Sequence, residues 1–257
     1  MNLSIINTSI GYQGVPIIKN INLELAGNEI FCVLGSNGVG KSTLFKTLLG
    51  LLKPISGKIM LNGKDIAKWN RREFAREIAY IPQSHSTPFP FKVVDVVLMG
   101  RTAHLNLLGT PSKKDKIIAA ECLDLLGISH LKDNSFTHLS GGEKQLVIIA
   151  RALAQQPSFL IMDEPTSNLD FGNQIKVIKQ VKELKKESLG ILMSTHSPDH
   201  AFMCNDKVIV LHNGGVYRTG NTEDVITEQC LQKIYNTDIQ ILNHEGVNSR
   251  KICVPII

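Results

Sequence analysis

The sequence has no long apolar run, and none of its apolar stretches approaches the roughly 18 residues that a membrane-spanning helix needs. Its first residues, Met1-Asn2-Leu3-Ser4, also lack the basic start and the apolar stretch of a secretory signal. We therefore expect neither a transmembrane helix nor a signal peptide. If the protein works at a membrane, we expect another chain to hold it there.

Cysteine pairs and blocks of like charge are missing as well. The five cysteines are Cys32, Cys122, Cys204, Cys230 and Cys253. They lie far apart and include no Cys-x-x-Cys pair, which indicates reduced and mostly buried thiols in a cytosolic protein. The formal net charge of +5 is spread along the chain, and the lysines within residues 182–186 lie on the polar side of a predicted amphipathic helix. We interpret them as a solvated helix face and not as a nucleic-acid patch.

The overall composition is that of an ordinary soluble globular protein, with 43% apolar and 20% charged residues. A chain of 257 residues can form one large domain or two small ones around a substantial core.

A glycine-rich stretch organises the first third of the chain. It runs Gly35-Ser36-Asn37-Gly38-Val39-Gly40-Lys41-Ser42 and fits a phosphate-binding pattern. It joins a predicted buried strand, residues 30–34, to a predicted helix, residues 43–52, which is the context that the pattern needs. Such a loop directs backbone N–H groups at an anion, Lys41 can reach the β- and γ-phosphates, and Ser42 can ligate Mg²⁺. The alternative is a simple glycine-rich turn before a helix.

A second candidate for anion binding is Leu139-Ser140-Gly141-Gly142-Glu143-Lys144-Gln145. Ser140 and Glu143 form a predicted capping box at the start of a helix that extends through Ala154. Two glycines at a helix start disfavour the helix by about 1 kcal/mol each, so we expect another group to approach this backbone closely. A plain capped helix is the alternative.

Polar residues follow two further buried strands. Asp163 and Glu164 follow residues 159–162, and His196 follows residues 191–195. Because strands alternate with helices, we predict an α/β fold with a mostly parallel sheet, whose ligand lies beyond the carboxyl ends of the strands. The sequence therefore predicts that the glycine-rich loop, the acidic pair and His196 converge on one rim.

The remaining segments are predicted more simply. Residues 3–25 form strands, with Tyr12 in a turn, and residues 71–79 form a short helix. An inserted helical subdomain begins between Ser84 and Gly109, and its clearest helix is residues 112–126. Residues 222–235 are helical, and residues 239–242 and 252–257 form a terminal hairpin.

In their order and spacing these motifs resemble those of an ABC ATPase. The Walker A motif is similar to Gly35 to Ser42, the Q-loop to Gln83 and the signature to Leu139 to Gln145. The Walker B motif is similar to Asp163-Glu164, the D-loop to Ser167-Asn168-Leu169-Asp170 and the switch histidine to His196. The resemblance covers residues 1–220, and the signature is its most specific part. Glu143-Lys144 stands where Gln-Arg is frequent, and both changes keep the polarity.

The resemblance implies a P-loop NTPase fold with a mostly parallel core sheet, an N-terminal antiparallel β subdomain and an inserted helical subdomain. It implies one ABC ATPase domain over residues 1–257. Its core would be residues 1–88 and 155–220, its helical subdomain residues 89–154, and its accessory helix and hairpin residues 221–257.

The resemblance also implies roles for single residues. ATP would be bound by Tyr12, Gly35, Ser36, Asn37, Gly38, Val39, Gly40, Lys41, Ser42 and Thr43. Mg²⁺ would be held by Ser42 and Gln83 and, through water, by Asp163; Glu164 would polarise the attacking water and His196 would contact the γ-phosphate. Leu139, Ser140, Gly141, Gly142, Glu143, Lys144 and Gln145 would close over ATP held by a second copy of the chain. Asp170 would couple the two sites.

A narrower resemblance lies in residues 89–101 and in His104-Leu105, which are similar to the ATPase subunits of importers for ferric siderophores, haem, cobalamin and molybdate. It implies ATP hydrolysis that powers a membrane importer, with the chain peripheral on the cytoplasmic side. The implied partners are a second copy, a permease docking near Gln83 to Arg101 and, indirectly, a solute-binding protein, but no nucleic acid.

Three alternatives are weaker. A soluble ABC ATPase of nucleic-acid repair or translation usually has two cassettes, a long coiled coil or a basic arm, and this chain shows one cassette and none of the others. An ABC exporter half needs membrane spans, and a small-molecule kinase leaves Ser140 to Gln145 unexplained.

Overall fold

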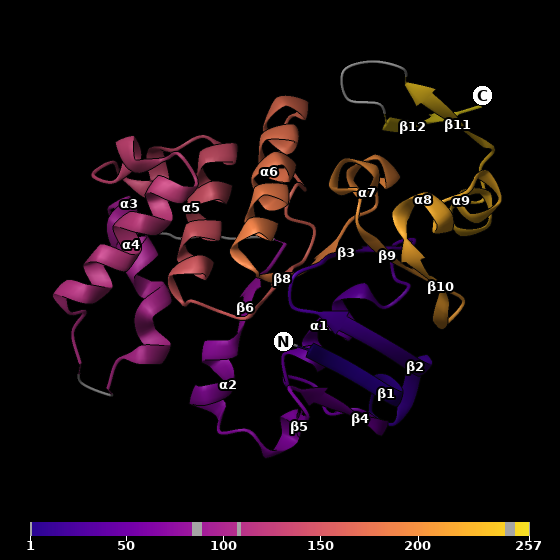
Figure 1. Ribbon diagram of the computed structural model, residues 1–257, viewed down its shortest axis with the longest axis horizontal. Coiled ribbons are helices and arrows are strands. Elements are labelled where there is room, and N and C mark those ends of the chain that lie inside the picture. Colours follow the sequence, from indigo (N-terminus) through magenta and orange to yellow (C-terminus); the bar gives the residue numbers. More distant parts are fainter. Residues whose placement is uncertain (1, 84–88, 107–108, 245–249, 257) are drawn as a thin grey trace. The chain divides into compact units, whose positions relative to one another are not determined.

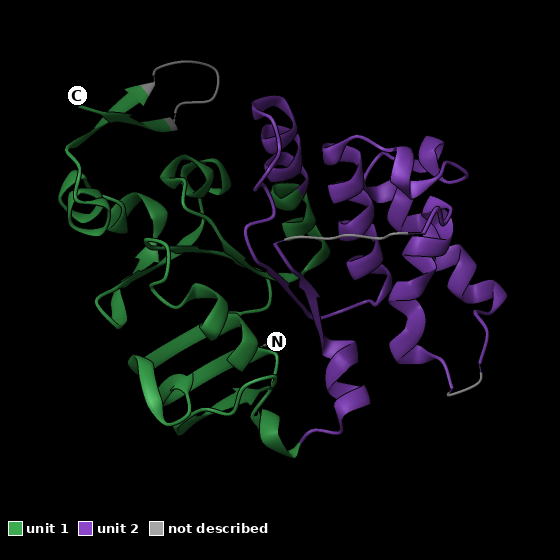
Figure 2. Cartoon of the chain, turned by 180° about the vertical axis from the view of Figure 1, so that it is seen from behind, with its two compact units in different colours: residues 1–68, 181–257 green, residues 69–180 purple. Residues whose placement is uncertain are grey.

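The computed structural model describes residues 2–83, 89–106, 109–244 and 250–256. The chain forms two compact units, one of residues 1–68 and 181–257 and the other of residues 69–180 (Figure 2). The subdomain boundaries predicted at residues 88, 154 and 220 stay predictions.

An antiparallel sheet opens the first unit (Figure 1). Its strands are β1 Asn2–Tyr12, β2 Val15–Ala26, β4 Ser56–Leu61 and β5 Lys64–Asp65, in the order β2-β1-β4-β5. A two-residue turn joins β1 to β2: Gln13 and Gly14 both have positive φ, 51° and 79°, as a tight hairpin requires. Side chains of β2 alternate between buried and exposed from Ile21 to Leu25, which confirms the predicted half-buried strand.

The rest of the first unit is built on parallel strands. They are β3 Ile30–Leu34, β8 Gly190–Ser194 and β9 Lys207–His212, with β10 Gly215–Asn221 antiparallel at the edge, in the order β10-β9-β3-β8. Every residue of β3 and β8 is buried, because parallel strands are covered on both faces. The helical elements between these strands are α1 Lys41–Leu48, η1 Ile66–Lys68, η5 Lys185–Glu187 and α7 Pro198–Cys204.

The first unit ends in helices and a hairpin. The elements are α8 Thr222–Val225, α9 Glu228–Tyr235, β11 Ile239–His244 and β12 Arg250–Pro255. The hairpin is confirmed, since β11 and β12 pair antiparallel from Ile239–Pro255 to His244–Arg250. The helix predicted over residues 222–235 is two helices, because the chain is extended at Ile226 and Thr227 and Thr227 caps α9.

The second unit combines two strands with a group of helices. The strands β6 Ile78–Ile81 and β7 Phe159–Met162 pair in parallel. The helical elements are α2 Arg71–Glu77, α3 Val93–Leu98, η2 Met99–His104, α4 Lys113–Leu125, η3 Ser129–Leu131, η4 Phe136–His138, α5 Gly141–Ala154 and α6 Phe171–Leu184, which ends in the first unit. Capping boxes at Ser112 and Ser140 start α4 and α5 as predicted. The fold class is therefore α/β with mostly parallel core strands, as predicted.

Two predicted helix ends are wrong. The helix expected over residues 71–79 ends at Glu77, because Ile78 and Ala79 pair with β7 and are buried there. The helix expected over residues 43–52 ends at Leu48, followed by Gly50 at a φ of 67°. Of the segment in which the helical subdomain was expected to begin, residues 84–88 and 107–108 lie outside the described residues.

Gly100 and Arg101 lie in the packed interior of the second unit. Arg101 is 5% exposed; its Nε donates to Asp115 at 2.8 Å and its Nη1 to the Ala154 oxygen at 2.8 Å. The hydroxyl of Ser112 and then the Arg101 guanidinium hold the pKa of Asp115 well below its usual range. Arg101, at one end of the predicted docking segment, is thus a packing residue of this unit.

Replacing Gly100 by alanine is expected to destabilise the protein by about 1–3 kcal/mol or more. A Cβ at Gly100 would lie 2.0 Å from the backbone oxygen of Arg151, so helix α5 would have to shift. Urea unfolding measures the effect. Gly215→Ala is the matched control, because its Cβ would meet open space. Equal stabilities of the two variants would contradict this packing.

Candidate nucleotide-binding site

The glycine-rich loop has the shape of an anion cradle. It leaves the buried strand β3 and ends at Gly40, which adopts a φ of 111° and begins α1. A Cβ at Gly35 would lie 2.7 Å from the backbone oxygen of Leu211, so the loop passes too close to β9 for a side chain. Within α1, no side chain caps the N-terminus and the first turn has no acidic residue. The helix start therefore offers its N–H groups and positive dipole end to an anion.

Lys41 is buried at this helix start, with 6% of its surface exposed. Its Nζ donates to the backbone oxygen of Gly35 at 2.8 Å and to that of Ser36 at 3.2 Å. A buried ammonium is costly unless it has such partners. The loop thus folds around the cation, and the next residue, Ser42, is exposed at the same helix start.

Tyr12 and His196 also belong to the first unit. Tyr12 is the last residue of β1, paired with Val15, and not a turn residue as predicted. Its side chain is 42% exposed, so its ring is available for stacking. His196 is exposed two residues after the end of β8, and its backbone oxygen accepts a hydrogen bond from the Tyr235 hydroxyl at 2.9 Å.

The acidic pair stands at the end of β7 in the second unit. Asp163 is 5% exposed, and burial followed by the negative charge of Asp163 raises the pKa of Tyr80. Glu164 has a φ of 48°, a backbone conformation that is uncommon outside glycine and clusters at functional sites. Its Oε2 accepts a hydrogen bond from Gln83 Nε2 at 2.8 Å. The structure thus joins two of the predicted residues, Gln83 and Glu164, directly.

The predicted metal ligands suit Mg²⁺ chemically. The Ser42 hydroxyl, the Gln83 amide oxygen and the Asp163 carboxylate are oxygen donors, which Mg²⁺ prefers. Since the Gln83 nitrogen is bonded to Glu164, its amide oxygen is the atom left to meet a metal. Few protein ligands are needed, because Mg²⁺ at such sites keeps several waters and binds substrate phosphates.

The signature stretch begins α5. Ser140 is its N-cap, and Glu143 Oε2 accepts hydrogen bonds from Ser140 N at 2.8 Å and from the Ser140 hydroxyl at 2.7 Å. These bonds lower the pKa of Glu143. Leu139 is buried, whereas Ser140 is exposed.

The close approach expected at the two glycines is made within the chain. A Cβ at Gly142 would lie 2.4 Å from Asn173 Oδ1, and a Cβ at Gly141 would lie 3.3 Å from Leu169 Cδ2. Asn173 also donates to Asp170, from its backbone N at 2.9 Å and from Nδ2 at 2.6 Å. These bonds lower the pKa of Asp170. The signature and the D-loop are therefore packed against each other through Asn173.

Sequence reasoning missed Asn173 and Tyr235 as partners of the predicted site residues Asp170 and His196. Asn173 had a local signal, because an amide three residues after Asp170 suits a helix start. The contact between Tyr235 and His196 spans 39 residues of sequence and had no local signal. The convergence of all predicted site residues on one rim stays a prediction.

Comparisons with known proteins place this geometry in a family. Residues 18–167 match the sequence model of the family described as ABC transporter. An ABC transporter ATP-binding protein of Haemophilus influenzae is 46% identical over 243 residues, which cover 95% of this chain and 92% of that protein. A protein of Helicobacter pylori, described as an iron chelatin transport ATP-binding protein, is 37% identical over 96% of this chain and 97% of its own length.

A solved structure agrees with the sequence comparisons. It shows an ABC transporter described as being of the metal-chelate type, in an inward-facing conformation; it is 33% identical and matches 99% of this chain and 97% of its own with a TM-score of 0.88. No helix among the described residues is long and apolar enough to cross a membrane. The chain belongs to the ABC transporter family, as one of its ATP-binding proteins.

Proposed function

We propose that this chain hydrolyses ATP to power a membrane importer for an iron(III) chelate or a related metal complex, such as a siderophore, haem, cobalamin or molybdate complex. The observation that carries the ATPase is Lys41, held at the uncapped start of α1 by the Gly35 and Ser36 oxygens. The iron chelatin protein and the metal-chelate transporter support the substrate class.

Binding of ATP is assigned to the first unit. The loop amides and Lys41 neutralise the β- and γ-phosphates, since a helix start and a cation both favour an anion. The Ser42 hydroxyl would be a ligand of Mg²⁺, and the exposed ring of Tyr12 stacks on the adenine. The remaining ATP-binding residues are Gly35, Ser36, Asn37, Gly38, Val39, Gly40 and Thr43.

Hydrolysis is assigned to Glu164 and His196. Mg²⁺ bound through Ser42, Gln83 and, by way of water, Asp163 would neutralise charge on the β- and γ-phosphates. Glu164 accepts the proton of the attacking water, and its bond to Gln83 fixes the orientation of its carboxylate. His196 contacts the γ-phosphate. Positioning and charge neutralisation are the main needs of phosphoryl transfer.

Two copies of the chain would share two nucleotides. We assign Leu139 to Gln145 to the nucleotide of the opposite copy and Asp170 to the coupling of the two sites. Ser140 is exposed and caps the N-terminus of α5, and both observations support a phosphate contact there. The packing of Asn173 on Gly142 supports the coupling. Asn173 is hydrogen-bonded to Asp170, so a shift of the D-loop would displace the residue that packs against the signature.

The remaining partners are a permease and, through it, a solute-binding protein, with the chain peripheral on the cytoplasmic side. The experiment that tests this function is purification of the chain from membranes, with identification of the proteins that accompany it and assay of their ATPase. Permease subunits are the expected companions. Nucleic acid or translation factors in their place would favour the alternative of a soluble ABC ATPase.

A cysteine at position 92 is expected to cross-link to a cytoplasmic loop of the permease. The Lys92 side chain is 59% exposed, and its Nζ lies 3.6 Å from Asp133 Oδ1. Such an exposed ion pair contributes little to stability, so the substitution should be tolerated. Ser86, the other suitable position, lies outside the described residues. Mass spectrometry of the cross-links is the measurement.

The wild-type chain is the background control for this experiment, since four of its thiols are buried and Cys253 is half-buried. A second cysteine at Val254, on the terminal hairpin, tests the competing surface. Cross-links that form only from position 254 would overturn the docking assignment.

A further inference from the structure

The C-terminal segment holds the chain next to His196 at two points. The Tyr235 hydroxyl, at the end of α9, donates to the His196 backbone oxygen at 2.9 Å. The Cys253 backbone N, on β12, donates to Asp199 Oδ1 at 2.9 Å. The two acceptors lie three residues apart at the start of α7, and the two donors come from different C-terminal elements, of which β12 lies next to α7 in Figure 1.

Both donors belong to half-buried residues; the bond to Asp199 is partly buried, whereas the bond to the His196 oxygen lies at the surface. Burial is the main cause that raises the pKa of the Tyr235 phenol well above its usual range. Burial, and then the negative charge of Asp199, raises the pKa of the Cys253 thiol to about 12. Loss of the bond to the His196 oxygen therefore has a modest energetic cost, because water can take the place of the hydroxyl at the surface. What acts on His196 is the geometry of this hydrogen bond, which restrains its backbone oxygen.

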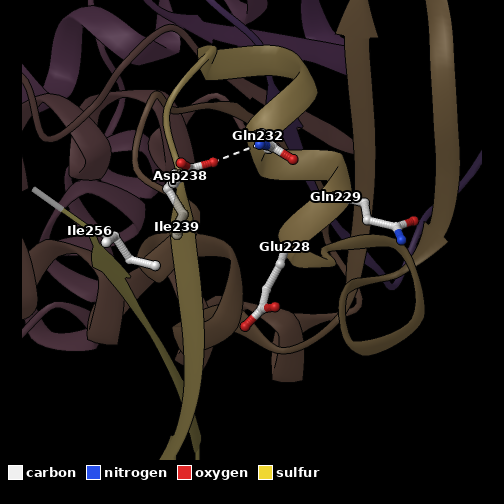
Figure 3. A pocket seen from close by; sticks show the side chains of 6 residues that line it. All are labelled: Glu228, Gln229, Gln232, Asp238, Ile239 and Ile256. Carbon is white, nitrogen blue, oxygen red and sulfur yellow. Dashed lines mark hydrogen bonds between the residues drawn. The ribbon is translucent and has the colours of Figure 1, made fainter.

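Helix α9 is hydrogen-bonded to β11 and to Asp238 just before it, and β11 pairs with β12. Glu228 Oε1, on α9, accepts from Ile241 N at 2.8 Å, and Gln232 Nε2 donates to Asp238 Oδ1 at 2.6 Å. Figure 3 shows the second bond at the edge of a cavity of about 240 Å³ between α9, β11 and Ile256. The hairpin is thus linked by hydrogen bonds to the helix that carries Tyr235.

The loop that bears His196 is also tied from within. The Thr195 hydroxyl interacts with His200 Nδ1 at 2.9 Å and accepts from Ser197 N at 3.1 Å. Burial, and then the charge of His196, lowers the pKa of His200. His196 itself is exposed between these internal ties and the C-terminal contacts. Its backbone oxygen is restrained by Tyr235.

We propose that Tyr235 is a positioning residue for hydrolysis, and that helix α9 and strand β12 set the placement of His196. The inference rests on the proposed role of His196 and gives a task to a segment beyond the nucleotide motifs. Because ATP is bound by Lys41 and its loop, loss of the Tyr235 hydroxyl should lower kcat and leave the affinity for ATP unchanged.

The test is Tyr235→Phe in the full chain, which keeps the ring and removes the hydroxyl. We expect kcat to fall about two- to tenfold, the effect of one neutral hydrogen bond, while the Kd for MgATP stays unchanged. In NMR spectra, the ring signals of His196 should shift and those of His212, on β9, should not. Asp199→Ala, which removes the other tie, should lower kcat in the same way.

Tyr217→Phe, on β10, is the matched control, because it also removes a tyrosine hydroxyl. It keeps the ring, whose centroid lies 4.5 Å from Lys233 Nζ. It should keep the wild-type kcat. Wild-type kcat in Tyr235→Phe, or a loss confined to thermal stability with His196 signals unmoved, would overturn the positioning role. A wild-type chain without ATPase activity would instead overturn the proposed function, and the positioning role with it.

Discussion

Replacing Lys41 by alanine is expected to abolish tight binding of MgATP and to leave the fold intact. The Lys41 ammonium is buried and held by two loop oxygens, so it brings a fixed positive charge to the phosphates. Hydrogen bonds of a charged group contribute about 1.5–3 kcal/mol each, so losing the contacts to two phosphates weakens binding by at least about 100-fold. Alanine is also the best helix former, which spares α1.

Isothermal titration calorimetry measures this affinity. Lys46→Ala is the matched control, because Lys46 lies on the same helix and is exposed to solvent. It removes the same charge and should bind MgATP like the wild type. Wild-type affinity in Lys41→Ala would exclude the glycine-rich loop from the mechanism.

Replacing Glu164 by glutamine is expected to lower the rate of phosphate release by about 10²–10⁴-fold, the contribution typical of a general base. The amide keeps the size of the side chain and an oxygen that can still accept the hydrogen bond from Gln83. Folding and ATP binding should therefore survive, and only the proton acceptor is lost.

A phosphate-release assay at saturating MgATP measures this effect. Glu187→Gln, an exposed change in η5, is the control and should leave the rate unchanged. If Glu164→Gln hydrolyses ATP at the wild-type rate, the base lies elsewhere, and His196 is the next candidate.

The strands and capped helices could be predicted because their signals are local. The unbroken apolar run of β3, the alternation in β2 and the capping boxes at Ser112 and Ser140 each determine one element from neighbouring residues. Ile78 and Ala79 were misassigned to a helix because pairing with β7 overrode the local pattern.

The candidate site divides in the same way. The loop around Lys41 was found because its chemistry requires a fixed spacing of glycines and lysine. The burial of Arg101 was not foreseen, because its partners, Asp115 and Ala154, lie far along the sequence. The same holds for Tyr235 and His196, since a tyrosine in an amphipathic helix looks like any packing residue.

The two glycines at the start of α5 can be explained by packing within the chain or by contact with a phosphate. Two glycines at the start of α5 indicated a close approach, which the structure assigns to Asn173 of the same chain. A phosphate contact at Ser140 is a separate proposal, because Ser140 is exposed beside that packed glycine.

The central claim, that two chains share two nucleotides, is tested most directly by light scattering of the Glu164→Gln protein with MgATP. We expect a dimer that persists, and a monomer when Ser140→Arg is added, because the large side chain would fill the phosphate position. Ser112→Arg is the matched control, since it removes the same kind of capping box from α4 and should leave the dimer intact. A dimer that tolerates Ser140→Arg as well as Ser112→Arg would contradict the shared site.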